Sequence, residues 1–327
     1  MKLAEFLPAQ PNPLWALSRQ MGVSHAICKC APELTGLNPP WDLEALRTIQ
    51  RRFTDAGFCL FGLEGDQFDM SRIKLGLPGR DEDIARYQQM LRNMGTLGIP
   101  LLCYNFMAGI GWHRNRTDVP ARGGALVSRF DVADVPATLT EAGAVSEAQM
   151  WSNYEYFIRR VIPVAEQSSV NMAMHPDDPP LAALRGIGRI LYRPENFERA
   201  MALAPSPANG VTFCQANFQL MGGDLAHWAR RFAAAGKLNF IHFRDVRGTA
   251  ERFEETFHDD GPTDMPAMLK LYHEIGFTGP IRVDHVPAMA GEDNDQPGYG
   301  VLGRLFAIGY LKGIMQTLGI PLEQYHE

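Results

Sequence analysis

The chain lacks any long apolar run. None of its hydrophobic stretches approaches the roughly 18 uninterrupted residues that a membrane helix needs, so we expect no membrane span. The first residues, MKLAEFLPAQPNP, are interrupted by Glu5 and by prolines, and they lack the apolar centre of a signal peptide. We therefore expect a cytoplasmic protein.

Cysteine, basic charge and nucleotide-binding motifs are also scarce. The 327 residues include five cysteines without a repeated CxxC pair, which argues against a disulfide framework and favours a reducing compartment. With 31 Lys and Arg against 37 Asp and Glu, the net charge is −6, so we expect no nucleic-acid partner. No GxGxxG or GxxxxGK[ST] motif follows an apolar run, which removes the main reason to expect a Rossmann or P-loop domain.

What the chain does contain is a regular alternation of short apolar runs and amphipathic segments. The runs are β-branched or aromatic, and several are apolar on both faces, as buried parallel strands are. Eight strands are predicted, at residues 2–7, 22–29, 57–64, 99–106, 170–176, 210–216, 238–246 and 279–286. Helices are predicted at residues 42–56, 81–97, 147–168, 195–203, 224–235, 264–275 and 301–317. This order is typical of an α/β protein with a (β/α)8 TIM barrel.

One segment breaks the alternation. Residues 107–146 follow the fourth predicted strand, show weak periodicity and are rich in Gly, Arg and Asp. A loop of this length in a compact domain is usually a lid or a binding loop, and here it would lie on the face where barrel enzymes place their active sites. No linker divides the chain, so we expect residues 1–327 to form a single barrel domain with this insertion.

Four residues with metal-ligating side chains stand at or just after the ends of successive predicted strands. They are His175, Cys214, His242 and Asp284, at intervals of 39, 28 and 42 residues, about one strand–helix unit each. Imidazole, thiolate and carboxylate groups arriving together at the mouth of a barrel predict a divalent-metal site, and this ligand set suits Zn²⁺, Fe²⁺ or Mn²⁺. An open coordination position would make the ion a Lewis acid for a substrate oxygen.

Candidate acids and bases lie next to these ligands. His285 directly follows Asp284, and Tyr299 lies in a Pro-Gly-rich turn beyond the last strand. Both are candidates for proton transfer at the barrel mouth.

Substrate contacts are expected from other polar residues on the same face. Arg114 and Arg116 in the insertion, together with Arg244, are candidates for clamping a carboxylate. Asn217 and His258 complete the expected substrate-binding set.

Together these motifs resemble the mannonate dehydratase family. The resemblance runs from about residue 74 to residue 317 and is strongest at the strand ends. Its motifs are CYNFM, MHPDDPP, HFRDVRG followed by FHDDG, R-x-DH, and PGYG followed by GRL. The MHPDDPP motif and the spacing from DH to PGY are the most specific of them.

The resemblance implies a xylose-isomerase-like barrel that removes water from D-mannonate to give 2-keto-3-deoxy-D-gluconate with Mn²⁺ or Fe²⁺. It assigns the metal to His175, Cys214, His242 and Asp284, and the acid/base pair to His285 and Tyr299, without saying which is which. It also leads us to expect a homo-oligomer, a dimer or a tetramer, with a small sugar acid as the only other partner.

The chain departs from the family pattern beside several ligands. Residues 215–218 read QANF where a TGSLG-type sequence is usual, Asp245 stands where Asn is usual, and the WxRT stretch is lengthened across residues 112–117. We therefore keep three alternatives: a hydro-lyase for another aldonic or uronic acid, a metal-dependent sugar isomerase or epimerase, and a non-catalytic barrel.

Overall fold

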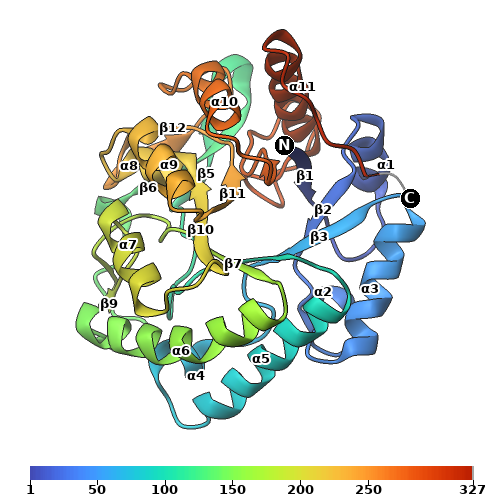
Figure 1. Cartoon of the computed structure of the whole chain (residues 1–327). Coiled ribbons are helices and arrows are strands. Elements are labelled where there is room, and N and C mark those ends of the chain that lie inside the picture. Colours follow the sequence, from blue (N-terminus) through green and yellow to red (C-terminus); the bar gives the residue numbers. More distant parts are fainter. Residues whose placement is uncertain (326–327) are drawn as a thin grey trace.

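The protein is a closed barrel of eight parallel strands surrounded by helices (Figure 1). The computed structural model describes residues 1–325, so the last two positions of the predicted domain lie outside the described residues. The barrel strands are β1 (Lys2–Phe6), β2 (His25–Cys28), β3 (Cys59–Glu64), β4 (Leu101–Tyr104), β7 (Asn171–Met174), β10 (Asn209–Cys214), β11 (Leu238–His242) and β14 (Pro280–Arg282). Around the barrel the order is β1-β14-β11-β10-β7-β4-β3-β2. The predicted TIM barrel is therefore confirmed, and every barrel strand except β10, which begins one residue early at Asn209, falls within a predicted strand.

The helices pack outside the barrel. They are α1 (Pro13–Gln20), α2 (Pro32–Thr35), α3 (Leu43–Asp55), α4 (Ser71–Leu75), α5 (Arg80–Thr96), α6 (Glu147–Gln167), α7 (Pro194–Leu203), α8 (Gln215–Leu220), α9 (Leu225–Ala234), α10 (Met265–Glu274) and α11 (Val301–Thr317). Five of them begin after a residue whose side chain accepts a backbone N–H of the first turn, namely Asn12, Asp42, Ser146, Asp224 and Asp264. The short α1, α2, α4 and α8 were not predicted. Helix α8 starts at Gln215, so strand β10 ends at Cys214, two residues before its predicted end at residue 216.

Two apolar layers hold the barrel. A small inner cluster fills its interior and consists of Ala4, Ile27, Leu101, Cys103, Ala173 and Phe240. A larger layer lies between the strands and the helices, where α3, for example, buries Leu46, Ile49 and Phe53. Within the described residues, the helices lack the combination of length and apolar character that a bilayer crossing requires.

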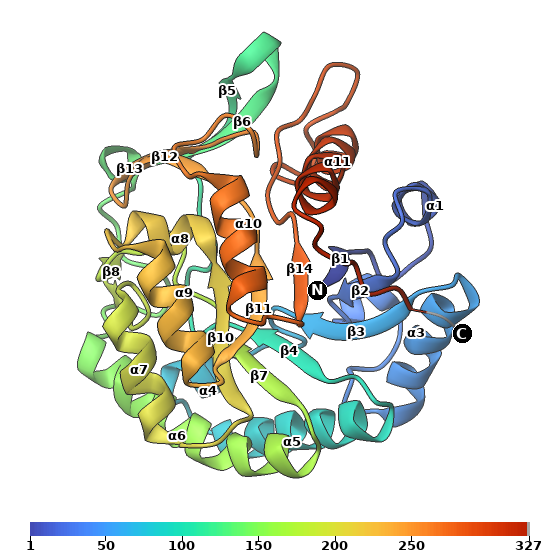
Figure 2. The same ribbon diagram turned by 45° about the horizontal axis from the view of Figure 1, so that its top comes forward.

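The insertion contains two strands and is more ordered than an irregular loop. Strands β5 (Arg116–Pro120) and β6 (Leu126–Asp131) form a hairpin that projects from the barrel (Figure 2). Strand β6 pairs with β13 (Arg252–Glu255), which pairs with β12 (Val246–Thr249), giving an antiparallel sheet in the order β12-β13-β6-β5. The hairpin escaped prediction because β5 is an edge strand with no fully buried residue, so it has no apolar face to reveal it. A second, two-stranded sheet pairs β8 (Ala183–Leu184) with β9 (Ile187–Gly188).

The contact between β6 and β13 predicts how firmly the hairpin is held. Phe130 is fully buried, and its ring lies 5.8 Å from that of Phe253. Because truncating a buried Phe typically costs about 3–5 kcal/mol, we expect Phe130→Ala to loosen this sheet and to raise the rate of tryptic cleavage at the exposed Arg116 and Arg122 at least tenfold. Val132→Ala, at an exposed apolar residue nearby, is the control. Equal cleavage rates in both variants would show that the hairpin is held by other contacts.

Candidate metal and acid/base site

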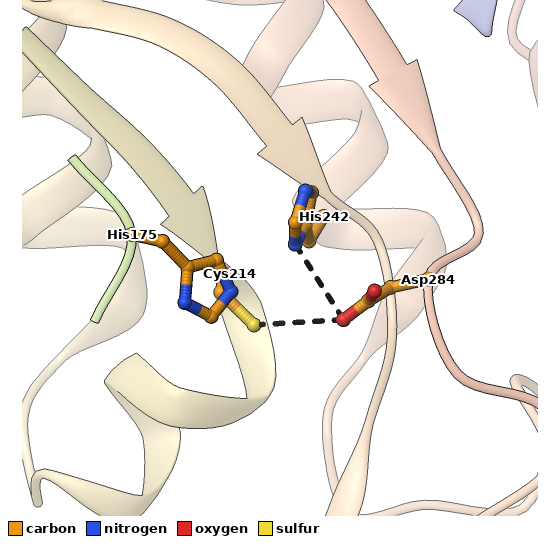
Figure 3. A group of neighbouring side chains, drawn as sticks. All are labelled: His175, Cys214, His242 and Asp284. Atoms are coloured by element: carbon orange, nitrogen blue, oxygen red, sulfur yellow. Dashed lines mark hydrogen bonds and ion pairs between the residues drawn. The ribbon is translucent and has the colours of Figure 1, made fainter. Parts of the chain in front are cut away.

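The four predicted metal ligands meet at one side of the barrel mouth. His175 follows β7, Cys214 ends β10, His242 ends β11 and Asp284 lies two residues after β14. These four strands are consecutive around the barrel, so their carboxyl ends bring the side chains together (Figure 3). One ligand atom from each residue lies within 4.8 Å of all the others. The structure thus assembles the set that strand-end spacing predicted.

His242 shows that this cluster suits a metal ion. Its ring is 1 % exposed, yet neither ring nitrogen has a hydrogen-bond partner among the described residues. Nδ1 lies 3.5 Å from Asp284 Oδ2, and Nε2 lies 3.6 Å from Glu64 Oε2. A buried imidazole without hydrogen bonds is costly, and a cation bound between His242 and Asp284 would satisfy it. In His175, Nδ1 is 2.8 Å from the carbonyl oxygen of Pro176, which leaves Nε2 for a metal.

The charge on Cys214 and Asp284 also favours a cation. Burial alone would raise the pKa of Cys214, but the charge of Arg244 and the neighbouring rings of His175 and His242 lower it to about 5. Burial would likewise raise the pKa of Asp284, yet the neighbouring His285, Arg282 and His242 hold that pKa well below its usual range. Both groups are therefore anionic at neutral pH, as metal ligands must be.

The predicted arginine clamps bind protein carboxylates in the structure. Arg114 contacts Asp178 and Glu255 at 2.6 Å each, and Arg244 contacts the same two carboxylates at 2.7 Å. Both guanidinium groups are buried, and neither lines the cavity beside the ligands. Arg116 lies on the projecting hairpin, where it pairs with Asp118. Two of these arginines thus hold the site together, the third lies outside it, and a direct contact of any of them with substrate stays a prediction.

Asn217 and His258 also form hydrogen bonds with other groups of the protein. Asn217 Oδ1 is 2.9 Å from Cys214 Sγ and accepts a hydrogen bond from Arg244, while its Nδ2 donates to the carbonyl oxygen of Asp177. His258 Nε2 contacts the carbonyl oxygen of Phe243 at 2.6 Å. Neither residue lines the cavity, and their contact with substrate stays a prediction.

His285 and Tyr299 do face the cavity. This inner cavity has a volume of about 200 Å³, and its lining comprises Glu64, Gly65, Cys103, Tyr104, Asn105, Met107, Trp112, His175, Asp178, Asp284, His285 and Tyr299. The rings of His285 and Tyr299 meet edge to face, with centroids 5.3 Å apart. Asp284 has a φ of +24°, which breaks the alternation of a strand and lets Asp284 and His285 face the same cavity. Gly298 has a φ of +86°, and a Cβ there would lie 3.2 Å from the His285 ring.

Three charged residues that the sequence analysis did not select complete the site. Glu255 Oε1 lies 3.3 Å from His285 Nδ1. Arg282 pairs with Glu64 and contacts Asp284 at 2.7 Å. Arg282 belongs to the R-x-DH motif, so the sequence contained a signal by which this arginine could have been selected. Glu64 and Glu255 lie in no quoted motif and are found only through their contacts.

The geometry predicts the effect of removing a ligand. We expect Cys214→Ala and His242→Ala to lose stoichiometric metal after purification with Mn²⁺ present, because each removes one of four converging ligand atoms. Metal content per chain, measured by elemental analysis, checks this. Cys59→Ala, at a cysteine outside the cluster, should retain the metal. Full metal content in the Cys214→Ala and His242→Ala proteins would contradict the site.

Comparisons with known proteins identify the family of this chain. A family model described as D-mannonate dehydratase (UxuA) matches residues 19–142 and 132–322. Mannonate dehydratase 2 of Halalkalibacterium halodurans is 35% identical over 306 residues, covering 85% of this chain and 88% of that protein. Mannonate dehydratase of Thermotoga petrophila is 30% identical over 321 residues, covering 87% of this chain and 88% of that protein.

The crystal structure of mannonate dehydratase from Streptococcus suis serotype 2 superposes with a TM-score of 0.88 at 29% identity, covering 99% of this chain and 95% of that one. A D-psicose 3-epimerase, at 13% identity and a TM-score of 0.60, shares the fold alone. With its barrel, its four converging ligands and these relatives, the chain belongs to the D-mannonate dehydratase family.

Proposed function

We propose that this protein is a carbon–oxygen lyase that removes water from D-mannonate and forms 2-keto-3-deoxy-D-gluconate. The observation that carries the proposal is the cavity in which the four-ligand cluster faces His285 and Tyr299. The choice of D-mannonate comes from the relatives. They are named mannonate dehydratases, and this chain matches them over most of their length.

We infer that the metal is Mn²⁺ or Fe²⁺. The mixed set of two imidazoles, one thiolate and one carboxylate supports a divalent ion of intermediate softness. When bound, such an ion acts as a Lewis acid toward the substrate carboxylate and the neighbouring hydroxyl, and so stabilises the negative charge that develops when the C2 proton leaves.

His285 fits the role of the base. Glu255 accepts from its Nδ1, which leaves Nε2 to take the C2 proton and stabilises the imidazolium that results. As that proton leaves, its electron pair forms the C2–C3 double bond and the C3–oxygen bond breaks. The product of this step is an enol, which tautomerises to the 2-keto acid by protonation at C3.

Tyr299 fits the role of the acid. Burial, followed by the negative charge of Asp284, raises the pKa of Tyr299 to about 12, so the phenol is protonated at neutral pH. It can then donate its proton to the departing C3 hydroxyl, which leaves as water. Tyr299 is then a phenolate and His285 an imidazolium. Return of the proton from His285 to Tyr299 restores both groups for the next cycle.

The reaction type can be tested with one variant. We expect His285→Asn to bind metal normally and to lower kcat for D-mannonate about 10³-fold, within the range expected for loss of a general base. Formation of 2-keto acid measures turnover, and product mass separates dehydration from isomerisation or epimerisation, which conserve mass. His273→Asn, at an exposed histidine of α10, is the control. Normal turnover by the His285→Asn protein, or a product with the mass of the substrate, would contradict the assignment.

A second variant tests the orientation of His285. We expect Glu255→Gln to lower kcat about 10- to 100-fold with little change in KM, because Glu255 contacts the base and does not line the cavity. Asp178→Asn is the matched comparison, since Asp178 binds the same two arginines and makes no bond to His285. If both variants lose the same activity, the arginine network alone accounts for the effect of Glu255.

The remaining expectations are a cytoplasmic location and assembly into a dimer or tetramer. The five cysteines are free, and a reducing compartment would keep Cys214 available as a ligand. Light scattering on the purified protein measures the assembly state directly.

A further inference from the structure

The CYNFM motif contains a polar residue with no role so far. Asn105 follows β4, and its side-chain Oδ1 accepts hydrogen bonds from Lys74 Nζ at 2.9 Å and from the backbone N–H of Met107 at 3.1 Å. Both partners are donors only, so the oxygen of the amide must face them. The NH₂ group therefore points the other way, and no acceptor among the described residues binds it.

Lys74 holds this amide firmly. The lysine is 2 % exposed, and its Nζ also contacts both carboxylate oxygens of Asp66, at 2.9 and 2.6 Å. A buried ammonium with three fixed acceptors has little freedom to release Asn105. The amide donors are thus oriented before any ligand arrives, which lowers the cost of binding.

Asn105 stands where two cavities meet. It lines the inner cavity beside the metal ligands, and it also lines an outer cavity of about 650 Å³ together with Lys74, Asp66 and Trp112. The two cavities share Asn105, Met107 and Trp112. A ligand that begins at the metal ligands and extends into the outer cavity passes this amide.

The barrel order gives the direction of that extension. The metal ligands come from β7, β10, β11 and β14, which form one half of the mouth. The outer cavity lies over the other half, where Lys29 follows β2, Asp66 follows β3 and Asn105 follows β4. A sugar acid whose carboxyl end and C2–C3 bond face the metal ligands and His285 therefore directs its remaining hydroxylated carbons toward Asn105.

We propose that Asn105, held by Lys74 and Asp66, donates a hydrogen bond to a hydroxyl of the substrate beyond C3 and so selects open-chain sugar acids by their hydroxylated tail. This rests on the proposed function, because it takes the reacting carbons to lie at the metal ligands. Loss of one such uncharged bond corresponds to roughly a fivefold to tenfold change in affinity.

The test compares D-mannonate with its 4-deoxy, 5-deoxy and 6-deoxy analogues in the Mn²⁺-loaded protein. We expect Asn105→Ala and Asn105→Asp to raise KM for D-mannonate about tenfold with little change in kcat. For the one analogue that lacks the recognised hydroxyl, wild type and variants should have the same KM. Asn153→Ala is the matched control, because Asn153 donates to the backbone oxygen of Lys74 and lines neither cavity.

Each outcome is decisive. A KM penalty that is equal for D-mannonate and all three analogues, or absent from all of them, overturns the role of Asn105 while leaving dehydration intact. A fall in kcat with loss of metal in the Asn105→Asp protein would show a structural role instead. Failure of the wild-type protein to dehydrate D-mannonate overturns the proposed function, and this inference with it.

Discussion

The buried charges at the barrel mouth are the constraint on which the site depends. Three guanidinium groups, from Arg114, Arg244 and Arg282, face the negative charges of Cys214, Glu64, Asp178, Glu255 and Asp284. With neutral histidines this leaves two negative charges uncompensated, which is the charge of one divalent cation. Burial and Arg282 lower the pKa of His242, but Asp284 and Glu64 outweigh them and raise it well above its usual range. A proton on His242 is thus a partial substitute for the metal, and the two compete.

The barrel makes this concentration of charge tolerable. Parallel strands end at one face, so ligands from four neighbouring strands converge without any loop having to reach them. The arginines come from different places, Arg282 from β14 itself, Arg244 from the turn after β11 and Arg114 from the insertion. Each carboxylate therefore meets a guanidinium group supplied by another part of the chain, which lowers the cost of burying its charge.

The sequence predicted the barrel and the ligand set because both follow from strand ends. His175, Cys214, His242 and Asp284 needed only the strand positions to be found. The protein partners of the arginines could not be predicted, because side-chain direction after a strand cannot be read from spacing and Arg114 and Arg244 pair with carboxylates on distant segments. Two residues beside the ligands that depart from the family pattern have packing roles in the structure. Gln215 accepts a hydrogen bond from Tyr272, and Asp245 accepts one from the Thr263 N–H, so both side chains serve packing and neither lines the cavity.

The anchoring of Arg114 restricts how the cavity can open. This arginine precedes the β5–β6 hairpin and ties the insertion to Asp178 and Glu255. Swinging the whole insertion outward would strip both carboxylates of a partner inside the protein, at a cost of about 3–5 kcal/mol for a broken buried pair. The base of the insertion is thus anchored beside the inner cavity, and the outer cavity, which shares Trp112 with the inner one, offers a route to the site that does not require the insertion to move. Along this route, a ligand would reach the site while the β5–β6 hairpin keeps its position.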